Sequence, residues 1–170
     1  MRLSTSCLAI LLLLAPLTSY ADDPPSKVAF EHLKGLIGNW KPTNPKDPTQ
    51  IEIKLIASGS ALVETWAMSP TRQSMTIYTL DGDRLLATHY CPQGNAPRLA
   101  YTKTDNSGAH HFQFLDGTNL QNPKASHEHA LWIREETDGT LTRSETYIAN
   151  GTSYDPAKDT GEIQTFVRAK

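Results

Sequence analysis

The chain has 170 residues, 20% of which are charged, and a formal net charge of −2 at pH 7. A slightly acidic chain with no cluster of Lys and Arg argues against nucleic acid or another polyanion as a partner. The length is that of one ordinary domain with a hydrophobic core.

Residues 1–21 have the pattern of a secretory signal peptide. Arg2 supplies a short positive region, 8–17 is apolar throughout, and small residues precede a cleavage site after Ala21. The apolar run is much shorter than the roughly 20 residues of a membrane-spanning helix. We therefore expect the leader to be removed, 22–170 to form one domain with no transmembrane anchor, and the protein to be periplasmic or secreted.

A short amphipathic segment follows the leader. Apolar residues recur at helical spacing from Phe30 to Ile37, which predicts a helix over 26–37 whose apolar side covers the body of the domain. Strand-like sequence begins at 38–41. The prolines of 42–48 predict a loop, because proline has no N–H to donate to a central strand pairing.

The remaining chain consists of short runs of alternating apolar and polar residues that are separated by Gly, Asn or Asp. Asp81-Gly82 is a strong hairpin signal, and no helical segment of comparable length interrupts the pattern. Strands are expected at 51–55, 61–68, 74–80, 85–91, 98–104, 109–115, 127–135, 141–148 and 162–168, with the longest irregular segment at 116–126.

A meander of this kind has two open edges unless its last strand pairs with its first. We therefore predict an all-β fold, an antiparallel up-and-down β-barrel of about 8–10 strands with a short N-terminal helix. His110 and His111 should point to opposite faces, and Phe112 places His110 on the packed side.

Gly38, Trp40 and Arg168 carry a resemblance to a known superfamily. A helix, a Gly-x-Trp strand, a meander and an arginine on the last strand together resemble the lipocalins, or calycins. In that superfamily the tryptophan lies at the floor of the barrel and the arginine packs across its ring. The resemblance therefore implies that Arg168 packs on Trp40 and that the interior binds a small ligand.

A second resemblance covers most of the chain after the leader. The stretches 80–98 and 112–119, followed by His127 and His129, are similar to uncharacterised exported bacterial lipocalin-like proteins. That group has no established activity to transfer. Cys91 is the one cysteine after the leader, so the usual lipocalin disulfide is absent.

Charged residues fall on strand faces that also carry core residues. Glu64 lies in phase with Leu62 and Trp66, and Arg143 and Glu145 alternate with Leu141 and Tyr147. Charge inside a core is costly unless it is paired, so these residues should contact a ligand or each other. We expect a small, largely apolar ligand in the interior, contacted by Glu64, Trp66, Met68, Tyr78, His89, Tyr90, Arg98, Asn119, His127, His129 and Arg143.

Two pairs of potential metal ligands form an alternative. His89 and Cys91 share one strand face, and His127 and His129 share another, because side chains two apart on a strand point the same way. If both faces point inward, the four suit Zn²⁺ or Cu²⁺, and a single histidine suits haem. In the alternative without a metal, Cys91 packs as a small apolar residue and the histidines form structural hydrogen bonds.

Three functions therefore stay open at this point. The first is an exported barrel that binds a small apolar molecule, the second a metal- or haem-binding barrel, and the third an interaction module of the cell envelope whose outer face docks a partner. Catalysis is disfavoured, since the chain has no Gly-x-Ser-x-Gly, phosphate-loop or His-Glu-x-x-His motif.

Overall fold

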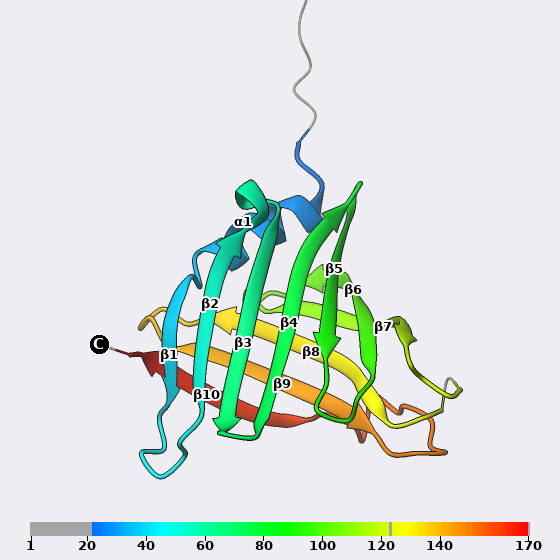
Figure 1. Ribbon diagram of the computed structural model, residues 1–170. Coiled ribbons are helices and arrows are strands. Elements are labelled where there is room, and N and C mark those ends of the chain that lie inside the picture. The colour runs from blue at the N-terminus through cyan, green and yellow to red at the C-terminus, as the bar shows by residue number, and fades with distance from the viewer. Residues whose placement is uncertain (1–21, 123, 170) are drawn as a thin grey trace, which may run out of the picture.

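The computed structural model describes residues 22–122 and 124–169, and the expected signal peptide lies outside the described residues. Ten antiparallel strands close into a barrel in the order β1-β10-β9-β8-β7-β6-β5-β4-β3-β2, with one short helix against one end (Figure 1). The predicted all-β class, the up-and-down barrel and the N-terminal helix are confirmed.

The elements follow the expected order. They are α1 (Pro25–Lys34), β1 (Gly38–Pro42), β2 (Gln50–Ile56), β3 (Ala61–Ser69), β4 (Arg72–Asp81), β5 (Arg84–Tyr90), β6 (Ala96–Thr104), β7 (His110–Thr118), β8 (His127–Glu135), β9 (Leu141–Ile148) and β10 (Glu162–Arg168). The helix is shorter than expected because the N–H groups of Gly35 and Leu36 bond to the carbonyls of His32 and Leu33 in a tight final turn.

The first and last strands close the barrel. Trp40 pairs with Arg168 and Lys41 with Val167, so β1 and β10 cover each other's edges. This confirms the pairing expected from the meander.

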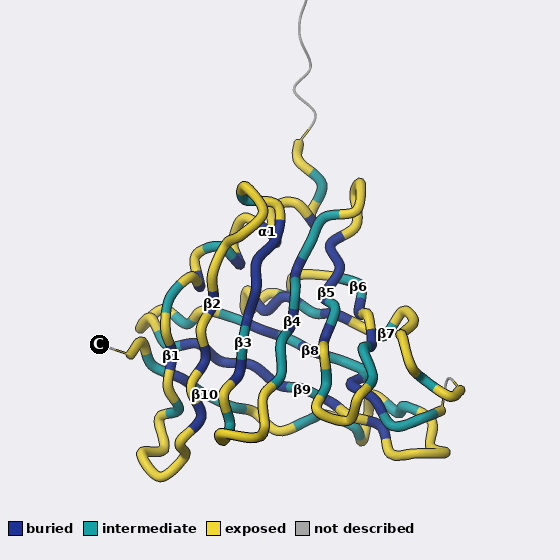
Figure 2. The backbone as a smooth tube through the Cα atoms, viewed as in Figure 1, coloured by how far each residue is buried: buried dark blue, intermediate teal, exposed yellow. Residues whose placement is uncertain are grey.

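α1 plugs one end of the barrel. Ala29, Phe30 and Leu33 are buried in the core, and the Ser26 hydroxyl donates to the carbonyl of Asp83 in the β4–β5 turn at 2.6 Å. Figure 2 shows buried stretches on α1 and along the strands, with exposed loops between them. Side chains fill the barrel at this end. We call the opposite end, where Glu145 and Tyr147 of β9 are partly exposed, the open end.

Trp40 and Arg168 lock the helix end to the barrel floor. The Trp40 indole N–H donates to the carbonyl of Leu36 at 2.8 Å, and the Arg168 guanidinium carbon lies 4.3 Å from the centre of the Trp40 ring. The same guanidinium donates to the carbonyls of Gly35 and Ile37, each at 2.9 Å. The packing of Arg168 on Trp40, implied by the resemblance to lipocalins, is therefore present.

A break in the strand alternation decides which part of β8 faces inward. Ile133 pairs with Arg143 and Leu131 with Glu145, but the register then shifts, so that Glu128 pairs with Tyr147. Directly paired residues of neighbouring strands lie on the same face of the sheet. The bulge therefore turns Glu128 into the barrel interior.

His110 and His111 lie as the alternation predicts. His110 is buried, with Nδ1 2.8 Å from the Thr104 hydroxyl, whereas His111 is partly exposed, with Nε2 2.7 Å from a carboxylate oxygen of Asp105. The His110 ring also lies 5.6 Å from the ring of His32 on α1. His110 thus joins the helical plug to the barrel.

The buried His110 predicts a pH-dependent stability. Burial, with a further contribution from His32, lowers the pKa of His110 to about 4. In the unfolded chain that pKa is about 6.5, so between these values the unfolded state binds more protons. The free energy of unfolding should therefore fall as the pH drops from about 6.5 to about 4, by up to roughly 2 kcal/mol from this group.

Urea unfolding at a series of pH values measures this effect. His110→Gln should flatten the slope in this window. His111→Gln changes the neighbouring, partly exposed position. It should keep the part of the pH dependence of the unfolding free energy that comes from His110. An unchanged slope in the His110 variant would contradict the assignment.

Candidate functional site

Charged and polar side chains meet inside the barrel, toward the end opposite α1. One part is built on a buried ion pair, and the other on a histidine with two carboxylates. We call the whole set the interior polar cluster; it consists of Glu64 and Trp66 of β3, Thr76 and Tyr78 of β4, His89 of β5, Glu128 of β8, and Arg143, Glu145 and Tyr147 of β9.

Glu64 is the centre of the ion-paired part. Its side chain is fully buried and forms an ion pair with the equally buried Arg143. The carboxylate also accepts hydrogen bonds from the Tyr78 hydroxyl at 2.7 Å and from the Trp66 indole N–H at 2.8 Å. Both carboxylate oxygens of Glu64 are therefore satisfied by charge-assisted hydrogen bonds.

Arg143 links this ion pair to the second part. Its guanidinium contacts the carboxylates of both Glu64 and Glu145 and lies 4.6 Å over the ring of Trp66. Burial alone lowers the pKa of Arg143, but the two carboxylates outweigh it and raise the pKa above the usual value. Arg143 is thus held as a cation between two acids.

His89 lies in the second part, where it is 2% exposed. Its Nδ1 is 3.0 Å from the Thr76 hydroxyl and 3.5 Å from a carboxyl oxygen of Glu128, and its Nε2 is 3.2 Å from the Tyr147 hydroxyl. Burial lowers the pKa of His89, which favours the neutral imidazole with one nitrogen free to accept.

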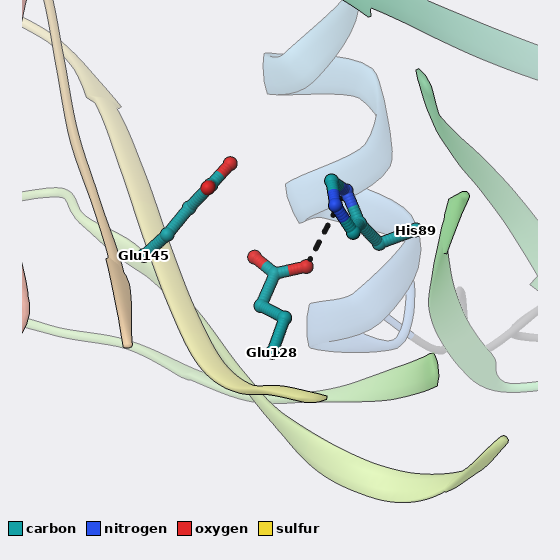
Figure 3. Close-up of side chains that lie close together, drawn as sticks. All are labelled: His89, Glu128 and Glu145. Carbon is teal, nitrogen blue, oxygen red and sulfur yellow. Dashed lines mark ion pairs between the residues drawn. The ribbon is translucent and has the colours of Figure 1, made fainter. Parts of the chain in front are cut away.

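Glu128 is the least satisfied member of the cluster. It is 1% exposed, and among the residues described here neither of its carboxyl oxygens has a hydrogen-bond partner. Burial, reinforced by Glu145, raises the pKa of Glu128 well above the usual value. Figure 3 shows Glu128 and Glu145 directed toward the His89 ring, and one ligand atom of each of the three lies within 4.8 Å of the others.

Carboxyl groups outnumber cationic groups in the interior polar cluster. Glu64, Glu128 and Glu145 supply three carboxyl groups, whereas Arg143 supplies one cation and His89 is held neutral. The cluster therefore has capacity for additional positive charge or for hydrogen-bond donors.

Solvent reaches the cluster from the open end. Tyr147 is 37% exposed and the Glu145 side chain is 20% exposed, while His89 and Glu128 lie beneath them. The Tyr147 hydroxyl donates to Glu145 at 3.3 Å. Burial, followed by the charge of Glu145, raises the pKa of Tyr147, so the phenol stays protonated and able to donate.

Five of the residues expected at the ligand site do lie in the cluster. Glu64, Trp66, Tyr78 and Arg143 all face inward, together with His89, as the strand alternation predicts. Met68 is partly buried against the same core. The structure adds Thr76, Glu128, Glu145 and Tyr147 to them.

Three other expected ligand contacts lie outside the cluster. Arg98 is exposed and paired with Asp116, and the Asn119 side-chain amide donates to the carbonyl of Gly94 at 2.7 Å. Tyr90 is 47% exposed and borders a groove of about 970 Å³ that crosses the outer face of β1–β5. The alternation that turns His89 inward turns Tyr90 outward.

The expected four-residue metal set is divided between two places. His127 and His129 contact each other at 3.1 Å, and His127 also contacts the carbonyl of Ala125 at 2.6 Å. Their rings pack on Phe114 and Tyr154 rather than on His89. Cys91 lies just beyond β5, half-buried, and burial raises the pKa of its thiol.

Sequence reasoning missed Glu128 because it assumed unbroken alternation in β8. That assumption places Glu128 on the face opposite to His127 and His129, and no residue type in His127-Glu128-His129 marks a bulge. Glu145 was placed on the same strand face as Arg143 from the sequence, although outside the expected ligand contacts, and Tyr147 could have been found from the same periodicity.

In the ranges 22–122 and 124–169, no helix has the length and apolar character needed to cross a membrane. Searches against models of known protein families and against curated proteins found no match to this chain.

The buried ion pair predicts a large loss of stability when one partner is removed. Arg143→Met would leave Glu64 and Glu145 without their cation in the interior, and should lower the free energy of unfolding by roughly 3–5 kcal/mol. Adding Glu64→Gln to this variant should recover part of the loss, because it removes one of the two abandoned charges.

Urea unfolding at pH 7 measures these differences. Arg98→Met is the matched control, since it breaks the exposed pair with Asp116 and should change stability by about 1 kcal/mol or less. Equal effects of the Arg143 and Arg98 variants would show that the interior pair is not desolvated as described.

Proposed function

We propose that this protein is an exported, lipocalin-like binding protein that takes a small, largely apolar molecule at the open end of its barrel. The support for this family is the closed antiparallel barrel together with the helical plug and the Trp40–Arg168 contact. The support for export is the signal-peptide pattern of 1–21.

The observation that carries the proposal is the unsatisfied carboxyl group of Glu128. Buried polar groups in folded proteins are nearly always hydrogen-bonded, and an unpaired one costs roughly 1–3 kcal/mol. Here both carboxyl oxygens of Glu128 are without such a partner, next to a neutral His89. A ligand group that donates to Glu128 would remove this cost on binding.

The charge of the cluster defines the polar group of the ligand. Three carboxyl groups against one guanidinium favour an amine or another hydrogen-bond donor and disfavour a carboxylate or phosphate. The apolar part of the ligand would contact Trp66, Met68 and the half-exposed Tyr147 at the open end. Because α1 and the core fill the other end, the site is shallow and suits a molecule that leaves part of its chain outside.

A matched pair of amphiphiles tests this function. Dodecylamine and dodecanoate have the same apolar chain and opposite charge, and each is titrated below its micelle concentration while tryptophan fluorescence or heat is recorded. We expect saturable binding of the amine and at least tenfold weaker binding of the acid, a difference of about 1.4 kcal/mol.

Single substitutions test whether dodecylamine binds at the interior polar cluster. Glu128→Gln should weaken dodecylamine binding about tenfold or more, because it removes the carboxyl group that would pair with the bound ammonium. Glu136→Gln, at a surface carboxylate paired with Arg134, is the control and should leave binding unchanged. Equal affinity for the amine and the acid, or the same affinity in the Glu128 variant, would contradict the proposal.

A further inference from the structure

We propose that the cation held by the interior polar cluster is a divalent transition-metal ion, bound by His89, Glu128 and Glu145, with Zn²⁺ as the reference ion. The inference rests on the proposed function in that it uses the same interior polar cluster, where the metal ion would take the place of the cationic group of a ligand at Glu128. It replaces the metal set expected from the sequence, keeping His89 and exchanging Cys91, His127 and His129 for two carboxylates.

The spacing of the donor atoms fits a single ion. His89 Nδ1 and the nearer carboxyl oxygen of Glu128 lie 3.5 Å apart. Two ligands of a tetrahedral zinc ion at about 2.0–2.1 Å from the metal are separated by about 3.3–3.4 Å. A carboxyl oxygen of Glu145 completes a triangle in which all three atoms lie within 4.8 Å of one another, so a small side-chain rotation brings it into range.

The three ligands come from three strands. His89 is on β5, Glu128 on β8 and Glu145 on β9, and Figure 3 shows the three side chains converging from these separate walls of the barrel. The strands are held by the closed hydrogen-bonded barrel, so the site is largely formed before an ion enters. A rigid scaffold of this kind lowers the entropic cost of binding.

Glu128 provides an observation that is independent of the acidic cluster itself. It is nine-tenths or more buried, points at His89, and has no hydrogen-bond partner for either carboxyl oxygen among the described residues. A metal ion is a stronger partner for such an oxygen than a neutral hydrogen-bond donor. It coordinates the lone pair of the oxygen and also neutralises the negative charge of the carboxylate.

The groups next to the three ligands hold them in position through hydrogen bonds and an ion pair. With Nδ1 directed to the metal, the His89 Nε2–H donates to the Tyr147 hydroxyl at 3.2 Å, and that hydroxyl donates to Glu145 at 3.3 Å. Arg143 holds the other oxygen of Glu145. These contacts fix the imidazole tautomer and the carboxylate position. The Thr76 hydroxyl competes for the same Nδ1 at 3.0 Å and must turn away when the ion binds.

The donor set identifies the class of metal. One imidazole and two carboxylates suit Zn²⁺, Co²⁺ or Mn²⁺, whereas Cu⁺ prefers thiolate or thioether ligands. A fourth coordination position would face Tyr147 and the open end of the barrel, where solvent or a donor atom of the small ligand has access.

Calorimetric titration of metal-stripped protein with Zn²⁺ tests the proposal. We expect one ion per chain, and an affinity that falls at least tenfold in Glu128→Gln and in Glu145→Gln, since each loses an anionic ligand. Co²⁺ titrated into the same proteins should give visible absorption bands of a four-coordinate nitrogen–oxygen site, with no thiolate charge-transfer band.

A control variant separates this site from the other histidine pair. A double variant, His127→Gln with His129→Gln, removes the other histidine pair and should keep zinc affinity within about twofold of the native value. Loss of zinc binding in that variant, with binding retained in Glu128→Gln, would overturn the proposal, as would failure of Zn²⁺, Co²⁺ and Mn²⁺ to bind at all.

Thermal unfolding distinguishes a variant that has lost metal binding from one that has failed to fold. Without metal, Glu128→Gln should be at least as stable as the native protein, because it removes an unpaired buried carboxyl group. Excess Zn²⁺ should raise the melting temperature of the native protein and not that of the variant. If dodecylamine binds to the metal-free protein and no metal ion binds, the proposed function stands and this inference is rejected. If Zn²⁺ binds as described and dodecylamine does not bind, the metal site stands and the proposed amine-binding function is rejected.

Discussion

The buried ion pair between Glu64 and Arg143 is the constraint on which the interior depends. It joins β3 to β9, which are not neighbours in the barrel, and both side chains are fully removed from solvent. Neither charge is tolerable there alone, so the pair requires that both strands keep one register and that the barrel stays closed. The hydrogen bonds from Tyr78 and Trp66 extend this requirement to β4 and to the neighbouring core.

The two ends of the barrel have different roles because different residues fill them. At the plugged end, α1 and the contact between Trp40 and Arg168 exclude water and cap the carbonyls of the helix end. At the other end, the ion pair is followed by groups that are buried but not fully paired. The first end gives stability, and the second retains a capacity to bind.

That capacity follows from an excess of carboxyl groups around one cation. Arg143 satisfies Glu64 and contacts Glu145, which leaves Glu128 beside a neutral His89. A cationic group of a small molecule or a metal ion would each supply the missing charge, and the metal also matches the donor spacing. The large groove on the outer face of β1–β5 is a separate feature, with no part in this charge balance.

The sequence by itself determined the strands and the turns, and it placed Glu64 and Arg143 on the strand faces that carry core residues. These follow from local alternation and from turn residues, which act over a few positions and are legible along the chain. Only the tertiary structure decided that Glu128 enters the interior in place of the histidines beside it. A bulge shifts the register by one residue, and its position depends on how β8 must pair with β9, which the local sequence does not encode.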